Sequence, residues 1–254
     1  MSADWQDASV AAGDYSFAEA VAGDLLLLAD LHDREPTVEV IAVVQSGPVQ
    51  EQFGLVLKSD PGLAALEAMW LAADALPRPI TPAALDELAA GYADVYLRHT
   101  YRAAPTESVW LSDEGLERQE PMLQVRAFYR RHNARVTDWA NRPDDHLVLQ
   151  LRFIARLLRP DCDASPDFKA AAQFMDEHIL LWIRSHAIRL VQAGAPDWYA
   201  ALSLLTTSYL EELRDQLETI TGVARAIPDA KVGKKEQAPD DVERPYVPGV
   251  APSW

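Results

Sequence analysis

Cysteine is almost absent from this chain of 254 residues, in which Cys162 is the only one. A single thiol excludes an intramolecular disulfide and any zinc or iron–sulfur site built from several cysteines. We therefore expect the protein in a reducing compartment, the cytoplasm. Aspartates flank Cys162 on both sides, in RPDCDASPD, and disfavour the thiolate that a nucleophile needs.

Long apolar runs are missing as well. No stretch approaches the roughly 20 apolar residues that span a bilayer, and the longest, LLLLADL and ILLWI, suit the buried faces of helices. The first residues, MSADWQDASV, are acidic and polar, unlike a secretory signal. We expect no stable insertion into a membrane.

Positive charge is scarce: 39 acidic residues face 23 lysines and arginines, a formal net charge of −16. A phosphate backbone would be repelled at long range, so nucleic acid is excluded as an expected partner and a cationic ligand is favoured. Residues 221–254 carry equal numbers of basic and acidic side chains. The whole surplus therefore belongs to the preceding residues.

Motifs that carry catalysis are absent too. The chain contains neither GxGxxG nor GxxxxGK[ST], the loops that bind phosphates, and no GxSxG element. His178 and His186 lie eight residues apart, about 12 Å along a helix, which is too far to share one metal ion. We expect His178 to pair with a carboxylate and His186 to be a hydrogen-bonded core residue. No catalytic residue, metal or cofactor is assigned.

What the chain does have is helical periodicity. Apolar residues recur every three or four positions in segments separated by proline-containing joints, which predicts an all-α, bundle-like body of about eight helices. The expected helices cover 16–32, 37–45, 60–75, 82–98, 120–133, 143–158, 166–192 and 196–219. Residues 1–15 are expected to be an N-terminal extension, 16–135 and 143–220 two halves joined by 134–142, and 221–254 a tail.

Two segments stand out from this pattern. Residues 99–114 form a loop without periodicity that still carries Tyr101 and Trp110. The run Pro143-Asp144-Asp145-His146 suits a helix start, because proline fits the first position and carboxylates in the first turn stabilise the helix dipole by ~0.3–1 kcal/mol each.

Together with their neighbours, these segments resemble a known family. The loop YRAAPTESVWLS of 101–112, the Glu120-Pro121 helix start with its RAFY turn, the Pro-Asp-Asp-His run, and the pair FMDEHILLWIRSHA and DWYAALSLLTTSYLEEL occur in the family's order. They look like the TorD/DmsD/NarJ family of redox-enzyme maturation chaperones over residues 16–220. Gln150 and Arg152 depart from the pattern, since the family often has glutamate at both positions.

The resemblance implies a helical, non-enzymatic, cytoplasmic chaperone. It would bind the twin-arginine signal peptide and the apo form of a molybdoenzyme catalytic subunit of the dimethyl-sulfoxide-reductase superfamily until the cofactor is inserted. Glu107, Glu120 and Asp145 would pair with arginines, and Tyr101, Trp110 and Phe153 would form an apolar wall. His146 would orient Asp145 or donate to a peptide carbonyl. The expected binding residues are Tyr101, Pro105, Glu107, Ser108, Trp110, Glu120, Pro143, Asp145, His146 and Phe153.

Alternatives remain open at this point. One is an assembly factor of the NarJ type, which binds a catalytic subunit that is not exported. Another is a small nucleotide-binding helical protein, with a guanine nucleotide as a weak ligand. Both a monomer and a domain-swapped dimer are compatible with the joint at 134–142, and nothing in the sequence names the client enzyme.

Overall fold

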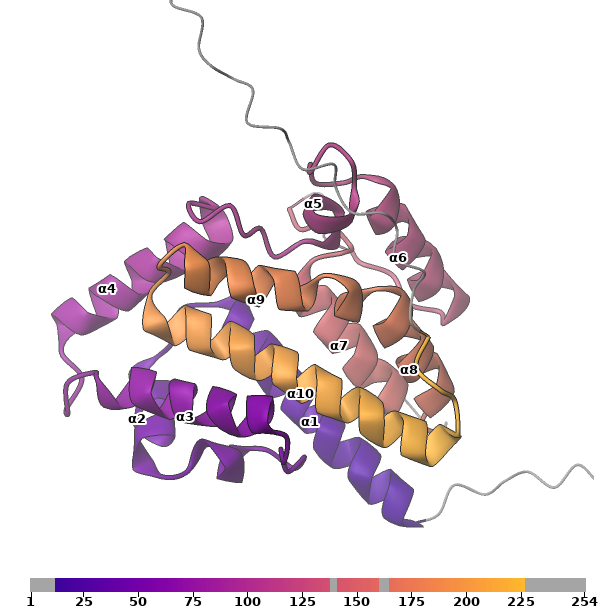
Figure 1. The fold of residues 1–254 in the computed structure, drawn as a ribbon, viewed down its shortest axis with the longest axis horizontal. Helices are drawn as coiled ribbons and strands as arrows, with labels where there is room; N and C mark the ends of the chain where they lie inside the picture. Colours follow the sequence, from indigo (N-terminus) through magenta and orange to yellow (C-terminus); the bar gives the residue numbers. More distant parts are fainter. Residues whose placement is uncertain (1–11, 138–140, 160–164, 227–254) are drawn as a thin grey trace, which may run out of the picture.

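The computed structural model describes residues 12–137, 141–159 and 165–226 (Figure 1). All the regular secondary structure that these residues form is helical, which confirms the all-α prediction. The elements are α1 (Ala12–Asp33), α2 (Val38–Ser46), η1 (Val49–Gln52), α3 (Asp60–Asp74), α4 (Pro82–Tyr92), η2 (Ala93–Leu97), α5 (Glu107–Leu111), α6 (Glu120–Arg131), α7 (Leu147–Leu158), α8 (Phe168–Glu177), η3 (Ile179–Leu181), α9 (Ile183–Gln192) and α10 (Asp197–Thr221).

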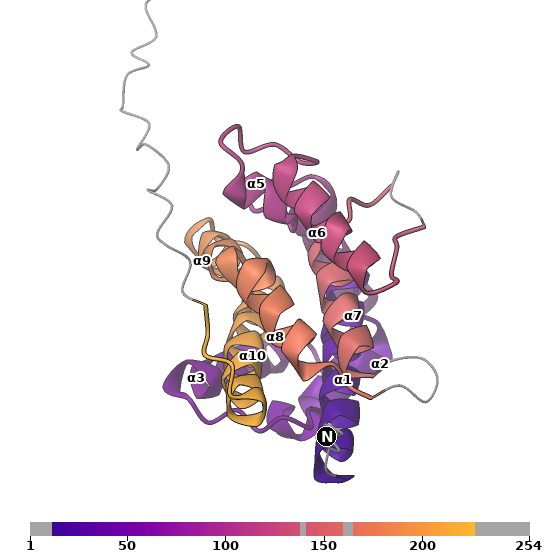
Figure 2. The same cartoon turned by 90° about the vertical axis from the view of Figure 1, so that its right-hand side faces the viewer.

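Two long helices organise the packing. α1 lies along α7, and α10 lies between α3 and α9, whereas α5 and α6 sit together at one end of the molecule (Figures 1 and 2). Leu25 of α1, Leu151 of α7 and Leu210 of α10 are all fully buried in one continuous core. The two halves expected from the sequence therefore share a single hydrophobic core, and within the joint expected at 134–142, residues 138–140 lie outside the described chain.

Several helices begin where a capping residue or a proline in the sequence predicts a helix start. Thr81 accepts a hydrogen bond from the Ala84 N–H (3.2 Å) ahead of a proline at the first helical position, which is a favourable N-terminal cap. α6 begins at Glu120 with Pro121 next, as expected.

Among the described helices, none combines the length with the apolar character that crossing a bilayer requires.

The helix expected over 166–192 is wrong in one respect, because it is broken into α8, η3 and α9. The breaks fall at His178 (φ −132°, ψ −89°) and at Trp182 (φ −133°, ψ −27°). They direct the His178 ring to Glu107 and the Trp182 indole to Gln150, so contacts with distant parts of the chain accompany the irregular backbone.

The helix start expected at Pro143 is also wrong. α7 begins at Leu147, and the Nδ1 atom of His146 caps it by accepting a hydrogen bond from the Val148 N–H (3.2 Å). Asp144 and Asp145 precede the helix, and their carboxylates bind other side chains instead of the helix dipole. Likewise, the loop expected at 99–114 contains the short helix α5.

The first residues of the expected tail lie against the body. α10 ends at Thr221, Gly222 adopts a left-handed conformation (φ 67°), and the Ala226 N–H donates to Asp176 (2.9 Å). Arg214 donates to the Val223 carbonyl (3.2 Å). The rest of the tail, residues 227–254, the extension 1–11 and Cys162 lie outside the described residues.

Candidate functional site

The start of α5 and the segment before α7 pair with each other. Thr106 and His146 form an isolated antiparallel bridge, and the Glu107 N–H donates to the Asp145 carbonyl (3.2 Å). The Leu147 N–H donates in turn to the Pro105 carbonyl (2.8 Å). We call residues 105–108 and 143–147 the α5–α7 junction. Two of the motifs that carry the family resemblance are therefore neighbours in space.

Asp145 lies at the centre of the junction, and its side chain is completely buried. Its Oδ2 atom accepts hydrogen bonds from the Ser108 N–H (2.7 Å) and the Ser108 hydroxyl (2.5 Å), while Oδ1 has no partner among the described residues. Burial raises the pKa of Asp145, against the opposing effect of the bonds from Ser108. The Ser108 hydroxyl also accepts from the Gln119 N–H (3.2 Å), which joins the segment before α6 to the junction.

Glu107 is the second buried carboxylate, with 1% of its surface exposed. It contacts the Nδ1 atom of His178 (3.0 Å) and accepts from the Gln150 amide (2.7 Å), which also donates to the Asp145 carbonyl (3.2 Å). Burial raises the pKa of Glu107, although its partners favour the charged form. The expectation that His178 pairs with a carboxylate is confirmed.

Asp144 fastens α6 to the same junction. Its carboxylate accepts from Arg126 (2.8 Å), and its carbonyl accepts from the Tyr129 hydroxyl (3.0 Å). The RAFY turn of α6 thus contributes both of its polar side chains to this attachment. The junction is accordingly a buried network that fixes α5, α6, α7 and α8 relative to one another.

His146 and His186 are poor proton carriers near neutral pH. Burial lowers the pKa of His146 to about 3 and that of His186 to about 4. His146 acts as the α7 cap, and Ser108 takes the place expected for it beside the Asp145 carboxylate. His186 is buried as expected, but neither ring nitrogen makes a hydrogen bond of normal geometry within the described part of the chain.

Next to the junction, an exposed acidic surface follows α5. Asp113, Glu114, Glu117 and Glu120 lie in one short segment, and Leu111 and Leu116 within it are 39% and 58% exposed. Sequence reasoning singled out only Glu120 here. The available signal was the run LSDEGLERQE, in which four carboxylates surround two apolar side chains. We call residues 111–120 the acidic segment.

The expected binding residues fall into four places. Pro105, Glu107, Ser108, Pro143 and Asp145 are buried in the junction, while Tyr101, Trp110 and His146 are half-buried at its edge and Glu120 is exposed. The Trp110 indole donates to the Ala104 carbonyl (2.9 Å). Phe153 packs against Tyr129 and Phe174, with ring centroids 4.4 and 4.8 Å away, and the structure does not bring it together with Tyr101 and Trp110.

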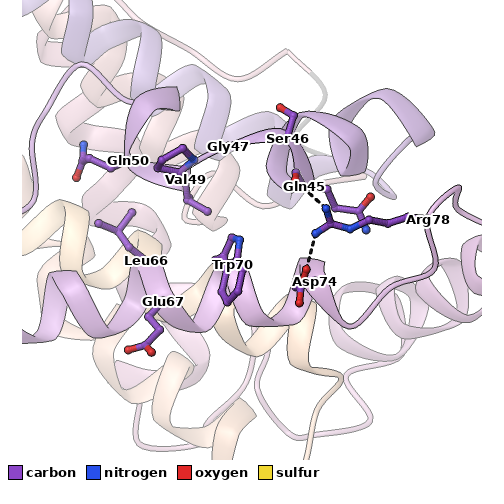
Figure 3. A pocket seen from close by; sticks show the side chains of 11 residues that line it. Gln45, Ser46, Gly47, Val49, Gln50, Leu66, Glu67, Trp70, Asp74 and Arg78 are labelled. Carbon is purple, nitrogen blue, oxygen red and sulfur yellow. Dashed lines mark hydrogen bonds and ion pairs between the residues drawn. The ribbon is translucent and has the colours of Figure 1, made fainter.

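Two cavities lie outside the junction. One, of about 590 Å³, separates the end of α2 from α3, where Trp70 and Leu66 point toward Val49 (Figure 3). Arg78 closes one side by binding Asp74 (2.5 Å) and the Gln45 carbonyl (3.3 Å). The other, of about 570 Å³, lies beside α7 and is rich in arginine. In the described residues, no group of histidine, cysteine and carboxylate side chains could hold a metal ion.

Comparisons with known proteins agree with the motifs. A family model described as nitrate reductase delta subunit matches residues 61–187, half of the chain, which include the whole junction. Chaperone protein TorD of Vibrio cholerae serotype O1 is 30% identical over 141 residues, covering 53% of this chain and 64% of the relative. Chaperone protein TorD of Shewanella pealeana is 28% identical over 147 residues, covering 55% of this chain and 64% of the relative.

A third relative, Chaperone protein TorD of Vibrio vulnificus, is 30% identical over 127 residues, covering 47% of this chain and 59% of its own. The chain thus spans less than two thirds of the length of the curated relatives it matches. The matched stretch nevertheless contains the α5–α7 junction, the acidic segment and the α8–α9 break. On these grounds the chain belongs to the nitrate reductase delta subunit family, the TorD/NarJ family that its motifs resemble.

Proposed function

We propose that this protein is a chaperone, without catalytic turnover, for the molybdopterin-containing catalytic subunit of a redox enzyme. It would bind the arginine-bearing signal peptide and the apo form of that subunit before cofactor insertion. The names of its relatives support the chaperone class. The observation that carries the ligand assignment is the acidic segment, where accessible carboxylates and apolar side chains lie beside the half-buried Trp110.

The exposed carboxylates are better partners for arginine than the buried ones. Glu107 and Asp145 already bind His178, Gln150 and Ser108, and opening such a buried set leaves polar groups unpaired at a cost of several kcal/mol. Carboxylates of the acidic segment need no such rearrangement. The junction then has a positioning role, because it fixes α5 and the start of α6, which flank the acidic segment.

A basic ligand also gains from the charge of the whole protein. A net charge of −16 attracts an arginine-bearing peptide at long range and raises its rate of association, while the placed carboxylates set its register. The apolar stretch of a signal peptide would contact the exposed leucines of the acidic segment. The acidic segment thus offers both charged and apolar side chains, the two kinds of group that peptide-binding surfaces commonly combine.

A second candidate is an assembly factor for a catalytic subunit that is not exported. The description of the matching family model, nitrate reductase delta subunit, favours it. Such a protein would bind the mature part of its client. Co-purification of a client with and without its leader separates the two, because only the first candidate loses most of its affinity when the leader is removed.

The signal-peptide assignment is tested by titration calorimetry with a peptide that carries two adjacent arginines followed by an apolar stretch. Glu114→Gln/Glu120→Gln should weaken binding about tenfold, since each lost charge pair contributes on the order of 0.5–1 kcal/mol at a partly exposed site. Asp86→Asn/Glu87→Gln on α4 removes the same charge from exposed positions and serves as the control. Equal losses in both variants would contradict the assignment of the acidic segment.

A further inference from the structure

The face of α3 that points away from the core is apolar over about two turns. Leu63, Leu66 and Trp70 follow one another along it at three- and four-residue spacing. Leu63 is 51% exposed, Trp70 is 42% exposed and Leu66 is half-buried. The opposite face, which includes Ala65 and Met69, is buried, and α3 packs against α10. An exposed tryptophan in such a stripe is typical of a surface that binds another molecule.

Part of this stripe forms one wall of the cavity of about 590 Å³ between the end of α2 and α3 (Figure 3). Residues 45–50 form the other wall, and Leu66 and Trp70 point across the cavity toward the buried Val49. All of the lining residues fall within the described stretch 45–78. We call this cavity the α2–α3 groove. It offers an apolar floor on which the apolar side chains of a ligand can pack.

Carboxylates border the groove on both walls. Glu67 of α3 points outward at its edge (Figure 3), and the Glu51 carboxylate lies beside Gly47, 3.8 Å from where a Cβ would stand. Both glutamates are exposed, and neither carboxylate binds another side chain in the described part of the protein. Arg78, the cation among the lining residues, is already bonded to Asp74 (2.5 Å). The border therefore carries negative charge that the described chain does not neutralise.

This charge disfavours several occupants of the groove. A second copy of the chain carries a net charge of −16 and would bring like charge to an acidic border. Phosphate backbones and anionic membrane surfaces are repelled for the same reason. Residues 38–78, which contain both walls, have five carboxylates and two cationic side chains. Charge complementarity thus selects a ligand that carries positive charge beside an apolar surface.

We propose that the α2–α3 groove binds an amphipathic helix of a partner protein, one whose apolar face is flanked by lysine or arginine side chains. The apolar face packs on Leu66 and Trp70, because side chains one turn apart on a helix match the spacing of those on a facing helix. The flanking cations pair with Glu51 and Glu67. A cation beside Trp70 also gains from the face of the indole ring.

The inference goes beyond the proposed function and does not depend on it. Figures 1 and 2 show α3 at the opposite end of the molecule from α5 and α6, which flank the acidic segment. The groove and the acidic segment are therefore separate surfaces. A short helix in the groove leaves the acidic segment accessible to a signal peptide.

The test uses the full-length protein and a fluorescein-labelled helical probe, with leucines at positions i, i+3, i+4 and i+7 and lysines on both sides of that face. Fluorescence anisotropy should show saturable binding that weakens about tenfold in Trp70→Ala, since tryptophans often dominate the affinity of an interface. Trp70→Phe keeps an aromatic ring and should recover most of the affinity. Ile188→Ala on α9, at a similarly exposed position (43%), is the control and should change the affinity less than about twofold.

The contribution of charge is tested separately. Glu51→Gln/Glu67→Gln should weaken binding of the probe about fivefold at low salt and by less at high salt, because salt screens exposed charges. Asp86→Asn/Glu87→Gln on α4 removes the same charge from other exposed positions and is the control. A scrambled probe of identical composition, which has no apolar face, should bind about tenfold more weakly than the ordered probe.

Three results would overturn the proposal: no saturable binding, equal binding of the ordered and scrambled probes, or equal weakening in Trp70→Ala and Ile188→Ala. Two others would overturn it by identifying a different occupant. One is a dimer of the protein alone that sediments as such and is dissociated by Trp70→Ala. The other is displacement of the probe by a synthetic peptide of the uncharged stretch 245–254 at a lower concentration than by unlabelled probe.

The arginine-bearing signal peptide is titrated in parallel. It should bind Trp70→Ala with unchanged affinity, because the acidic segment is intact in that variant. If the helical probe does not distinguish the variants while the signal peptide still requires Glu114 and Glu120, the groove proposal fails and the proposed function stands.

Discussion

Removing the Ser108 hydroxyl should destabilise the protein substantially for the size of the change. This hydroxyl donates to the buried Asp145 carboxylate (2.5 Å) and accepts from the Gln119 N–H (3.2 Å), so it connects three segments. Ser108 itself is fully buried. In Ser108→Ala, the Asp145 carboxylate keeps one donor, the backbone N–H of residue 108 (2.7 Å), and its Oδ1 atom still has no partner among the described residues.

The magnitude follows from the two lost bonds. A hydrogen bond to a charged group contributes about 1.5–3 kcal/mol and a neutral one about 0.5–1.5 kcal/mol. The better helix propensity of alanine at the start of α5 offsets about 0.5 kcal/mol. We therefore expect the free energy of unfolding of Ser108→Ala to fall by about 1.5–4 kcal/mol at neutral pH.

The deficit should depend on pH. Burial raises the pKa of Asp145 in the folded state above its unfolded value, so the folded protein loses stability as the pH rises through the folded pKa. Loss of a donor raises that pKa further. The difference between Ser108→Ala and the unmodified protein should consequently shrink as the pH falls through the folded pKa of Asp145, and reach its full size above the folded pKa of the variant.

Urea unfolding followed by circular dichroism at 222 nm, at neutral and acidic pH, measures this difference. Ser112→Ala is the matched control, because Ser112 caps the other end of α5 and its hydroxyl has no partner among the described residues. It should change the free energy of unfolding by less than about 0.5 kcal/mol. A deficit below about 1 kcal/mol for Ser108→Ala, or one equal to that of the control, would refute the role assigned to Ser108.

Three further outcomes are expected. Burial raises the pKa of Glu107, so unfolding free energy should fall as pH rises through that folded pKa, and Glu107→Gln should flatten this slope in urea titrations across pH 4–8. Arg214→Leu should cost about 3–5 kcal/mol in the same assay, because it leaves Asp176 buried without its bidentate partner (2.8 Å for both bonds), and Arg214→Leu/Asp176→Leu should recover most of it. Gly91→Ala should lower the melting temperature, since the added Cβ would lie 2.9 Å from the Tyr199 ring, at a cost of about 1–3 kcal/mol.

Most of the helices could be predicted from the sequence because the residues that start a helix, or that form its apolar face, lie within or next to the helix itself. The Thr81-Pro82 and Glu120-Pro121 starts rest on a cap or a proline within the helix itself, and both appear in the structure. The apolar repeat of α7 likewise needs no knowledge of its partner. Its buried positions Leu147, Leu151 and Ile154 are those the periodicity indicates.

The break between α8 and α9 could not be predicted from such local signals. Met175, Ile179, Trp182 and His186 keep helical spacing through both interruptions, so periodicity alone indicates one continuous helix. The contact that accompanies the break joins His178 to a carboxylate 71 positions earlier in the chain. A single sequence contains no information on which distant side chains meet, so this irregular backbone was beyond its reach.

The same limit explains the misplaced start of α7. Carboxylates after a proline are typical of a first helical turn, yet Asp144 binds Arg126 and Asp145 binds Ser108, both from other elements. The acidic segment is a different case. Its four carboxylates and two leucines were visible in the sequence, but only the structure shows that both leucines and all of these carboxylates except the half-buried Glu117 are exposed, while the expected partners Glu107 and Asp145 are buried.

Gln150 and Arg152, the two departures from the family pattern, have consistent physical roles. A glutamate at 150 would place a third carboxylate among buried Glu107 and Asp145, whereas the Gln150 amide donates to Glu107 and to the Asp145 carbonyl. Arg152 binds Asp30 and Asp33 and so ties α7 to α1. A glutamate there would face two carboxylates. Both changes therefore remove negative charge from positions where this chain already has it.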